Sequence, residues 1–219
     1  TSRSADRGAG HASVVISHIG DVKVYVQSTA SGAIGVRAAD GRLMWSYEID
    51  QTTAVIPTVI VRNDLVFFTV GYGRGSALLR QTSDGNGGVA VEEIYPLNKQ
   101  LSNKHGGVVL VGNEVYGDSE DSGIPFCADL MTGERKWKER GSGKGSASIT
   151  AADGHLYVFF SNGVLALVKA SPDEYNEVSS FEIPGGSERP SWAHPVITDG
   201  KIFLRNGDEI FCFDLRAKS

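Results

Sequence analysis

The amino-acid sequence predicts an all-β protein built from repeated four-stranded antiparallel sheets. Three observations lead to this fold class. Residues typical of tight turns recur at a regular interval. The segments between them are short and rich in β-branched and aromatic residues. No segment keeps an apolar period of 3.6 residues over three turns, so helix is expected to be nearly absent.

Two classes of turn define the repeat. The first is a hairpin signal between two apolar runs, and its members are Gly20-Asp21, Asn63-Asp64, Gly112-Asn113, Asp153-Gly154 and Asp199-Gly200. The second class follows about ten residues later, at Ser31-Gly32, Arg74-Gly75, Ser122-Gly123, Asn162-Gly163 and Asn206-Gly207. From Gly32 to Gly207 the chain runs through four intervals, which gives a period of about 44 residues and five repeats.

Each repeat offers up to four candidate strands around these turns. First strands are expected at 14–16, 58–60, 108–110, 148–150 and 196–197, and second strands at 22–26, 65–68, 156–160 and 201–204. Third strands are expected at 33–36 and 164–167, and fourth strands at 43–47, 94–95, 135–137 and 180–183. Four short strands in each 44-residue unit favour a β-propeller over a two-sheet sandwich. The approximate blades are 12–49, 54–98, 102–140, 145–183 and 191–215, with the second irregular.

The third repeat carries a recognisable motif, CADLMTGERKW at 127–137. It resembles the A-x-D-x-x-T-G-x-x-x-W docking motif of pyrroloquinoline-quinone (PQQ)-like propeller repeats, with Cys127 in place of Ala. The resemblance implies that Asp129, Thr132 and Gly133 belong to a tight turn between the third and fourth strands. It also implies that Trp137 packs into the next blade.

The other repeats keep less of this motif. The first retains the turn glycine Gly41 and Trp45, the fourth retains Ala166 without the Trp, and the last stops at Ser219 before a fourth strand could form. Proteins with this repeat include quinoprotein alcohol dehydrogenases, scaffolds similar to BamB of outer-membrane β-barrel assembly, and many uncharacterised planctomycete-type members. The resemblance covers nearly the whole chain.

Such propellers usually have seven or eight blades, and a strand from the N-terminus closes the ring. Residues 1–10 are polar and Gly-rich and do not have the pattern expected of the closing strand. We therefore expect the chain to be the C-terminal part of a larger propeller. A self-contained five-bladed ring is the alternative.

The cysteines bear on the enzymatic members of the family. Those enzymes use a vicinal Cys-Cys disulfide over the quinone, a stacked Trp, a calcium ion held by Glu and Asn, and a catalytic Asp. Cys127 and Cys212 lie two repeats apart, too far for the Cα separation of about 7 Å that a disulfide tolerates. No cofactor is expected. PQQ binding is considered only in the alternative in which the missing blades carry its ligands. Both thiols are expected to be buried and inert.

Five residues near the starts of first strands form the candidate site. They are His11, His105, Lys144, Trp192 and His194. The functional interpretation is that they converge at the mouth of a central channel and bind a small anion, a sugar or a metal. The alternative is that they are ordinary polar loop residues, with His capping a turn.

Two further segments invite a ligand interpretation that their context does not favour. The acidic stretch 118–121 lacks the alternation of a calcium loop and is expected to be a solvated hairpin tip. The glycine-rich stretch 71–75 has no helix behind it to hold a phosphate, so it is expected to be an inter-strand loop.

Charge and hydropathy limit the partners. A net charge of −5 makes nucleic acid a poor partner, and the longest apolar runs are too short for a membrane helix. The family resemblance implies a periplasmic or other extracytoplasmic location. We expect a non-catalytic propeller that serves as a scaffold for a protein partner. The alternatives are the C-terminal part of a quinone-dependent alcohol dehydrogenase and a propeller that binds a carbohydrate or small ligand.

Overall fold

The computed structural model describes residues 8–50, 52–184 and 191–216. This part of the chain forms nineteen strands in five antiparallel sheets. Its only helical segments are two single 3₁₀ turns, η1 (Lys99–Leu101) and η2 (Glu120–Ser122). The predicted all-β class with almost no helix is therefore confirmed.

The sheets fall into two compact units. The first contains the residues up to Lys104 together with the turn Leu130–Glu134. The second contains His105–Asp129 and the residues from Arg135 onward. Each unit is described by itself.

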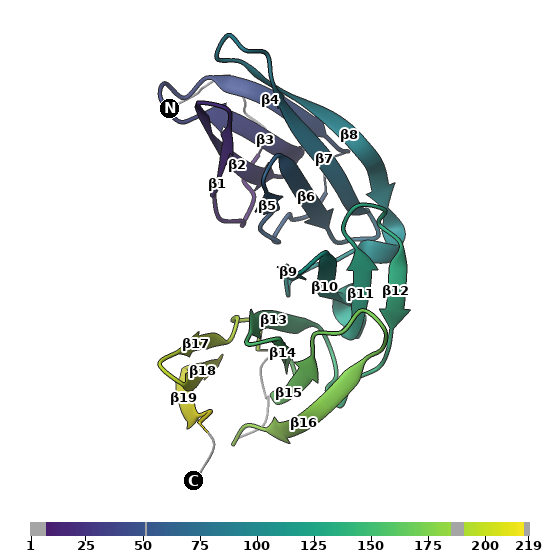
Figure 1. The fold of residues 1–219 in the computed structure, drawn as a ribbon. Helices are drawn as coiled ribbons and strands as arrows, with labels where there is room; N and C mark the ends of the chain where they lie inside the picture. The colour runs from purple at the N-terminus through teal and green to yellow at the C-terminus, as the bar shows by residue number, and fades with distance from the viewer. Residues whose placement is uncertain (1–7, 51, 185–190, 217–219) are drawn as a thin grey trace. The chain divides into compact units, whose positions relative to one another are not determined.

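The first unit holds two four-stranded sheets in which the strands follow one another in chain order (Figure 1). The first sheet consists of β1 (Val15–Ile19), β2 (Val22–Thr29), β3 (Gly32–Arg37) and β4 (Leu43–Glu48). The second consists of β5 (Ile60–Arg62), β6 (Leu65–Val70), β7 (Gly75–Ser83) and β8 (Val89–Asn98). Every neighbouring pair is antiparallel, so each sheet is a simple meander.

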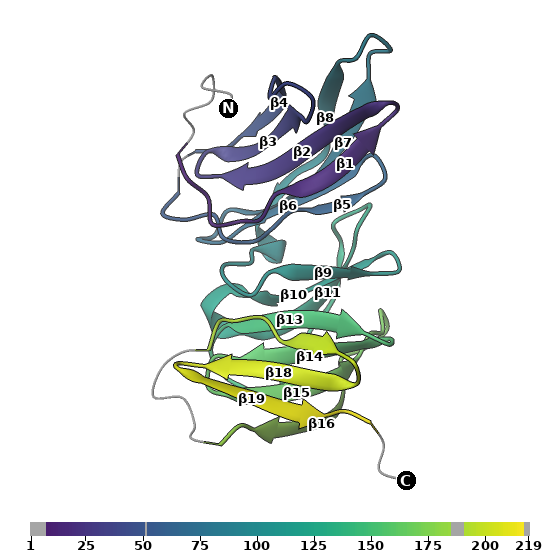
Figure 2. The same cartoon turned by 90° about the vertical axis from the view of Figure 1, so that its left-hand side faces the viewer.

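The second unit holds three further meanders (Figure 2). One consists of β9 (Val108–Val111), β10 (Glu114–Ser119), β11 (Ile124–Asp129) and β12 (Arg135–Lys138). The next consists of β13 (Ala147–Ala152), β14 (His155–Phe160), β15 (Val164–Lys169) and β16 (Asn176–Glu182). In the described part of the chain the last sheet has three strands, β17 (Val196–Thr198), β18 (Lys201–Asn206) and β19 (Glu209–Asp214).

The hairpins between the first and second strands use left-handed backbone, as the turn residues predict. The first such residue of each hairpin is Gly20 at φ 56°, Asn63 at 56°, Gly112 at 64°, Asp153 at 49° and Asp199 at 51°, and in the last two hairpins the following glycine also has positive φ. Gly, Asn and Asp tolerate this conformation better than other residues. The first class of turns is therefore confirmed in all five repeats.

The second sheet departs from the expected strand lengths. Its fourth strand was expected at 94–95, but β8 runs from Val89 to Asn98. The extension pairs with β7, which is also long, and a loop at 84–88 joins the two strands. The Asp84 carboxylate accepts hydrogen bonds from the backbone N–H groups of Asn86 (2.8 Å) and Gly88 (2.7 Å) and thereby closes this loop.

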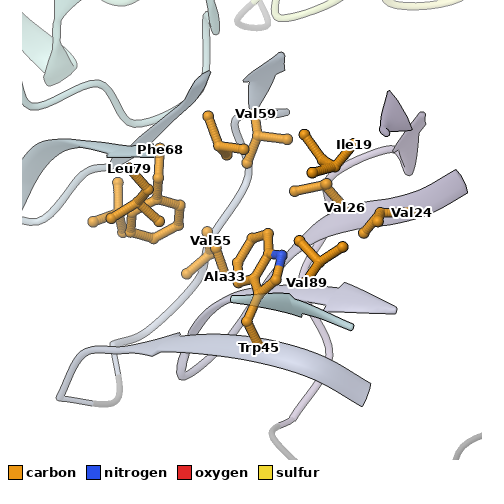
Figure 3. Close-up of a cluster of buried hydrophobic side chains, with 12 residues drawn as sticks. Ile19, Val24, Val26, Ala33, Trp45, Val55, Val59, Phe68, Leu79 and Val89 are labelled. Atoms are coloured by element: carbon orange, nitrogen blue, oxygen red, sulfur yellow. The ribbon is translucent and has the colours of Figure 1, made fainter. Parts of the chain in front are cut away.

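A tryptophan couples the two sheets of the first unit. Trp45 is 5% exposed and lies within a cluster of buried apolar side chains (Figure 3). Its indole Nε1 donates to Gln81 Oε1 on β7 at 3.2 Å, and Gln81 Nε2 donates to Ser17 Oγ on β1 at 2.8 Å. The buried amide thus bridges both sheets and satisfies the polar atoms of its two partners.

Trp137 occupies the corresponding position in the second unit. It is 7% exposed, and its Nε1 donates to the carbonyl oxygen of Ser171, beyond β15 in the next sheet, at 2.9 Å. Its ring lies 6.0 Å from that of Tyr116 and 5.6 Å from that of Tyr175. Trp137 therefore contacts both its own sheet and the next one.

The motif turn before Trp137 has the geometry of a tight loop. Asp129 ends β11, opposite Glu114. Thr132 Oγ1 accepts a hydrogen bond from the N–H of Glu134 at 3.2 Å, and Gly133 has φ 68°. The Gly133 carbonyl accepts a hydrogen bond from the Asn98 side chain at 2.9 Å, which ties the turn to the end of β8 within the first unit.

The expectation of two buried thiols is wrong for Cys212. Cys127 is fully buried, and burial raises the pKa of its thiol to about 11. Cys212 is exposed because it alternates along β19 with Phe211 and Phe213, which pack against the buried cluster, and so lies on the opposite face of the strand. The expectation of a missing closing strand concerns residues 1–10, of which 1–7 lie outside the described ranges, as does Ser219.

The acidic stretch 118–121 is not a fully solvated tip. Asp118 is the penultimate residue of β10 and is 2% exposed, and the last residue of the strand, Ser119, is also buried. The Asp118 carboxylate accepts a hydrogen bond from the backbone N–H of Ala147 at 3.0 Å, at the start of β13. Asp118 therefore joins two sheets of the second unit. The stretch 71–75 is an inter-strand turn, as expected, and leads into β7.

Candidate functional site

The most distinctive polar and aromatic contact of the second unit is a stack between His105 and Trp192. Their ring centroids are 4.5 Å apart and their planes differ by 10°. His105 lies in the loop before β9 and Trp192 in the loop before β17. Both were predicted as site residues from their positions before first strands, and the fold brings their rings into contact.

The Trp192 loop is held by hydrogen bonds on both sides of the indole. Before it, Ser191 is buried, its N–H donates to the Ser161 carbonyl at 3.2 Å and its hydroxyl to Asn206 Oδ1 at 2.8 Å. After it, two carbonyl oxygens accept hydrogen bonds from hydroxyls on β13: Ala193 from Ser148 (3.0 Å) and Pro195 from Thr150 (2.7 Å). Trp192 is therefore presented from an ordered backbone.

His194 lies against the loop that contains His105. Its Nδ1 is 3.1 Å from the Ile149 carbonyl, which selects the tautomer with the hydrogen on Nδ1, donating to that oxygen. A Cβ added at Gly107 would lie 3.0 Å from the His194 Cε1 atom, so the glycine leaves room for the ring. The loops before β9 and β17 are therefore in contact through two pairs of residues, His105 with Trp192 and Gly107 with His194.

An acidic side chain lies close to the stacked pair. Asp121 Oδ1 is 3.8 Å from His105 Nδ1, beyond hydrogen-bond distance.

The other two predicted site residues lie elsewhere. Lys144 is an exposed loop residue whose backbone N–H donates to Asn162 Oδ1 at 3.0 Å. His11 belongs to the first unit, is exposed, and its backbone N–H donates to the Val55 carbonyl at 2.8 Å. In both residues these hydrogen bonds involve the backbone, which fits the interpretation as ordinary loop residues.

A pocket of about 200 Å³ opens on the side of this loop. Its lining consists of Ser191, Trp192, Ala193, Arg205 and Gly207. Arg205, which lies near the end of β18, is not among the residues predicted from the sequence. Its position beside the Asn206-Gly207 turn was the available signal, because turns after second strands and loops before first strands share one end of an antiparallel sheet.

The described residues do not fit the quinone site of the enzymatic relatives. Cys127 and Cys212 are free thiols on β11 and β19, so they cannot form a vicinal disulfide. In residues 8–50, 52–184 and 191–216, no three His, Cys, Asp or Glu side chains gather closely enough to hold a metal ion. No helix in this part of the chain is long and apolar enough to cross a membrane.

Comparison with known proteins gives one family and a consistent fold. The family model described as outer membrane protein assembly factor BamB matches residues 2–139. The crystal structure of BamB from Moraxella catarrhalis superposes with a TM-score of 0.60 at 17% identity. That match covers 93% of this chain and 62% of the BamB chain, so the present sequence spans less than two thirds of that relative's length.

A designed protein has a similar arrangement. The crystal structure of the computationally designed Ika4 protein matches with a TM-score of 0.55 and 14% identity, covering 78% of this chain and 96% of the designed one. No curated protein matches the sequence. The structural matches support the β-propeller fold predicted from the repeat.

Proposed function

The chain belongs to the BamB family of PQQ-like propeller repeats, and from that premise we propose that it is a non-catalytic scaffold that binds a protein partner outside the cytoplasm. The observation that carries this proposal is the family match over residues 2–139. The name of the family associates it with the assembly of outer-membrane proteins. A component of that process is therefore the partner class to test first.

The coupling between sheets suits a scaffold. In the first unit the Trp45, Gln81 and Ser17 side chains form a buried chain of hydrogen bonds between two sheets. In the second unit Trp137 plays the equivalent part through Ser171. A surface carried on coupled sheets loses little conformational entropy when a partner binds, which favours affinity without any chemical step.

A quinone-dependent alcohol dehydrogenase is the less supported candidate. It would require the blades outside this chain to supply the disulfide, the calcium ligands and the catalytic Asp. Neither thiol of this chain can contribute to a vicinal disulfide, because one is buried in β11 and the other lies on β19. We therefore propose that the chain uses no PQQ.

Binding to an assembly component tests the scaffold function. The immobilised chain is exposed to the purified soluble domain of the outer-membrane β-barrel assembly subunit from the same organism, and binding is followed by biolayer interferometry. The designed Ika4 protein serves as a control because it matches the fold with a different sequence. Saturable binding to the chain and none to Ika4 supports the proposal. Equal binding to both contradicts it.

A second experiment addresses the enzymatic candidate. The full-length protein is incubated with PQQ and calcium, and alcohol oxidation is followed with an electron-accepting dye. We expect no quinone-dependent turnover. Turnover that requires the added quinone would end the non-catalytic interpretation.

A further inference from the structure

Trp192 is unusual among the tryptophans of this chain because it is 52% exposed, whereas Trp45 and Trp137 are almost completely buried. An indole carries a large apolar surface, and leaving it in water forgoes the stabilisation that its burial would bring. One exposed tryptophan is not by itself a binding site. Its surroundings carry the argument further.

The indole is held in one orientation by its neighbours. One ring face is occupied by His105 in a parallel stack at 4.5 Å. The preceding residue, Ser191, is anchored by hydrogen bonds to Ser161 and Asn206. A ligand that packs on the remaining surface would therefore not have to order the side chain first, which lowers the entropic cost of binding.

The pocket beside the indole is small and has both polar and apolar lining. Its volume of about 200 Å³ is below the range of about 300–1,000 Å³ typical of drug-sized ligands, so it suits a single ring. Trp192 and Ala193 are its apolar lining residues, and the remaining lining comes from Ser191, Arg205 and Gly207. An aromatic side chain and polar groups in one small pocket match a ring that has C–H groups on one side and hydroxyls around its edge.

Arg205 gives the pocket a positively charged group. Its Nε donates to the Gly207 carbonyl at 3.1 Å, which orients the guanidinium group at the pocket. In the described part of the chain no carboxylate forms an ion pair with it. Guanidinium groups bind carboxylates through paired, charge-assisted hydrogen bonds.

Because the chain is negatively charged overall, only a local contact such as that with Arg205 would hold an anionic ligand. At −5, the chain as a whole does not attract anions. An anionic ligand would therefore depend on this one short-range contact. An aromatic carboxylate fits less well, because a phenyl ring would leave the polar part of the lining without hydrogen-bond partners.

We propose that the pocket formed by Trp192, Arg205 and Ser191 binds the carboxylate-bearing pyranose ring of an acidic sugar, a uronic acid. The ring packs its C–H face on the exposed indole surface, and its carboxylate pairs with the Arg205 guanidinium. This ligand site is independent of the scaffold function.

Calorimetric titration of the full chain with trigalacturonic acid tests this assignment. Galactotriose, the neutral counterpart, separates the charge requirement from sugar stacking, and N-acetylphenylalanine represents a non-sugar ring with a carboxylate. We expect the uronate to bind at least about tenfold more tightly than the neutral sugar, which corresponds to about 1.4 kcal/mol. N-acetylphenylalanine is expected to bind more weakly than the uronate.

Variants identify the groups responsible. Arg205→Gln and Trp192→Ala should each weaken uronate binding by about tenfold or more, as expected for loss of a charge-assisted hydrogen bond or an aromatic surface. Arg140→Gln removes another exposed arginine of the same unit and should leave the affinity within about twofold. Equal affinities for charged and neutral sugars, or an unchanged Arg205→Gln affinity, would overturn the proposal.

A measurement on the unaltered chain guards against variants that fold poorly. Because Trp192 is the exposed tryptophan, acrylamide should quench mainly its fluorescence. Trigalacturonic acid should protect it from quenching, and galactotriose should not at the same concentration. Absence of protection together with absence of calorimetric binding contradicts the proposed site. Stronger protection by N-acetylphenylalanine contradicts the sugar assignment.

Discussion

The indole ring of Trp45 lies directly against Gly35, its partner across the β3–β4 ladder. A Cβ built on Gly35 would overlap the indole Nε1 and Cε2 atoms. Gly35 is not among the glycines with positive φ, so its role is to provide space rather than conformational freedom. The ring can therefore lie flat over its own sheet while Nε1 reaches Gln81 in the next sheet.

Gly35→Ala should destabilise the protein by about 1–3 kcal/mol through overpacking, without any backbone penalty. The free energy of unfolding in urea measures this cost. In a Trp45→Leu background the cost should be much smaller, because the overlapping ring is gone. Equal costs in the two backgrounds would contradict the packing of the ring over Gly35.

Trp137→Phe should lower the free energy of unfolding by about 1–3 kcal/mol. The substitution leaves the Ser171 carbonyl without the hydrogen bond from Trp137 Nε1 and removes part of a buried ring. Trp192→Phe is the matched control and should change stability by about 0.5 kcal/mol or less, because Trp192 is half exposed. The same urea titration distinguishes the two; similar losses would mean that Trp137 does not couple the sheets.

Gln81→Leu should destabilise the first unit by about 1–3 kcal/mol, because it leaves Trp45 Nε1 and Ser17 Oγ without hydrogen bonds in a buried environment. Leucine keeps approximately the same volume, so packing loss contributes little. Thr82→Ala changes the exposed neighbouring residue and should have an effect of about 0.5 kcal/mol or less. Thermal unfolding followed by circular dichroism provides the comparison.

The stabilisation that the Glu177 carboxylate provides should be lost in acid. Burial by itself raises the pKa of this carboxyl, but hydrogen bonds from Ser142 and Tyr175 outweigh it, and the net pKa lies below its ordinary value of 4.5. Because the folded-state pKa of Glu177 is lowered, its carboxylate stabilises the fold fully above pH 4.5. This stabilisation is lost as the pH falls through the folded-state pKa.

The urea midpoint, measured at about pH 6 and about pH 3, therefore reports on this group. Glu177→Gln should reduce the drop in midpoint between the two pH values. Glu182→Gln, an exposed carboxylate change on the same strand, should leave the drop as in the wild type. An unchanged drop in Glu177→Gln would show that its hydrogen bonds do not stabilise the fold.

The two thiols should differ in reactivity. Near pH 8, a thiol-specific disulfide reagent should modify one cysteine in the native protein and two after unfolding. Cys212 is exposed, whereas Cys127 is fully buried and its pKa is raised to about 11, so little thiolate forms there. Cys212→Ser should abolish the rapid native reaction and Cys127→Ser should not. Two rapidly reacting native thiols would contradict the burial of Cys127.

The candidate site was predictable in part. His105 and Trp192 were selected because they precede first strands, and their rings stack. Arg205 was missed because it lies near the end of a second strand, so its link to Trp192 exists only after β17 and β18 have paired. Lys144, like Trp192, lies shortly before a first strand, but its hydrogen bonds to Asn162 and Ser161 are made by its backbone. Position before a strand does not determine which way a side chain points.

The sequence by itself determined the five repeats, the near absence of helix and the hairpins. These features are local: a left-handed turn residue such as Asn63 or Asp199 and an adjoining β-branched strand specify a hairpin without reference to the rest of the chain. Only the tertiary structure decided the burial of Asp118, the exposure of Cys212 and the pocket at Trp192 and Arg205. Each depends on which strand or loop of a neighbouring sheet covers the residue, and no local sequence pattern encodes that neighbour.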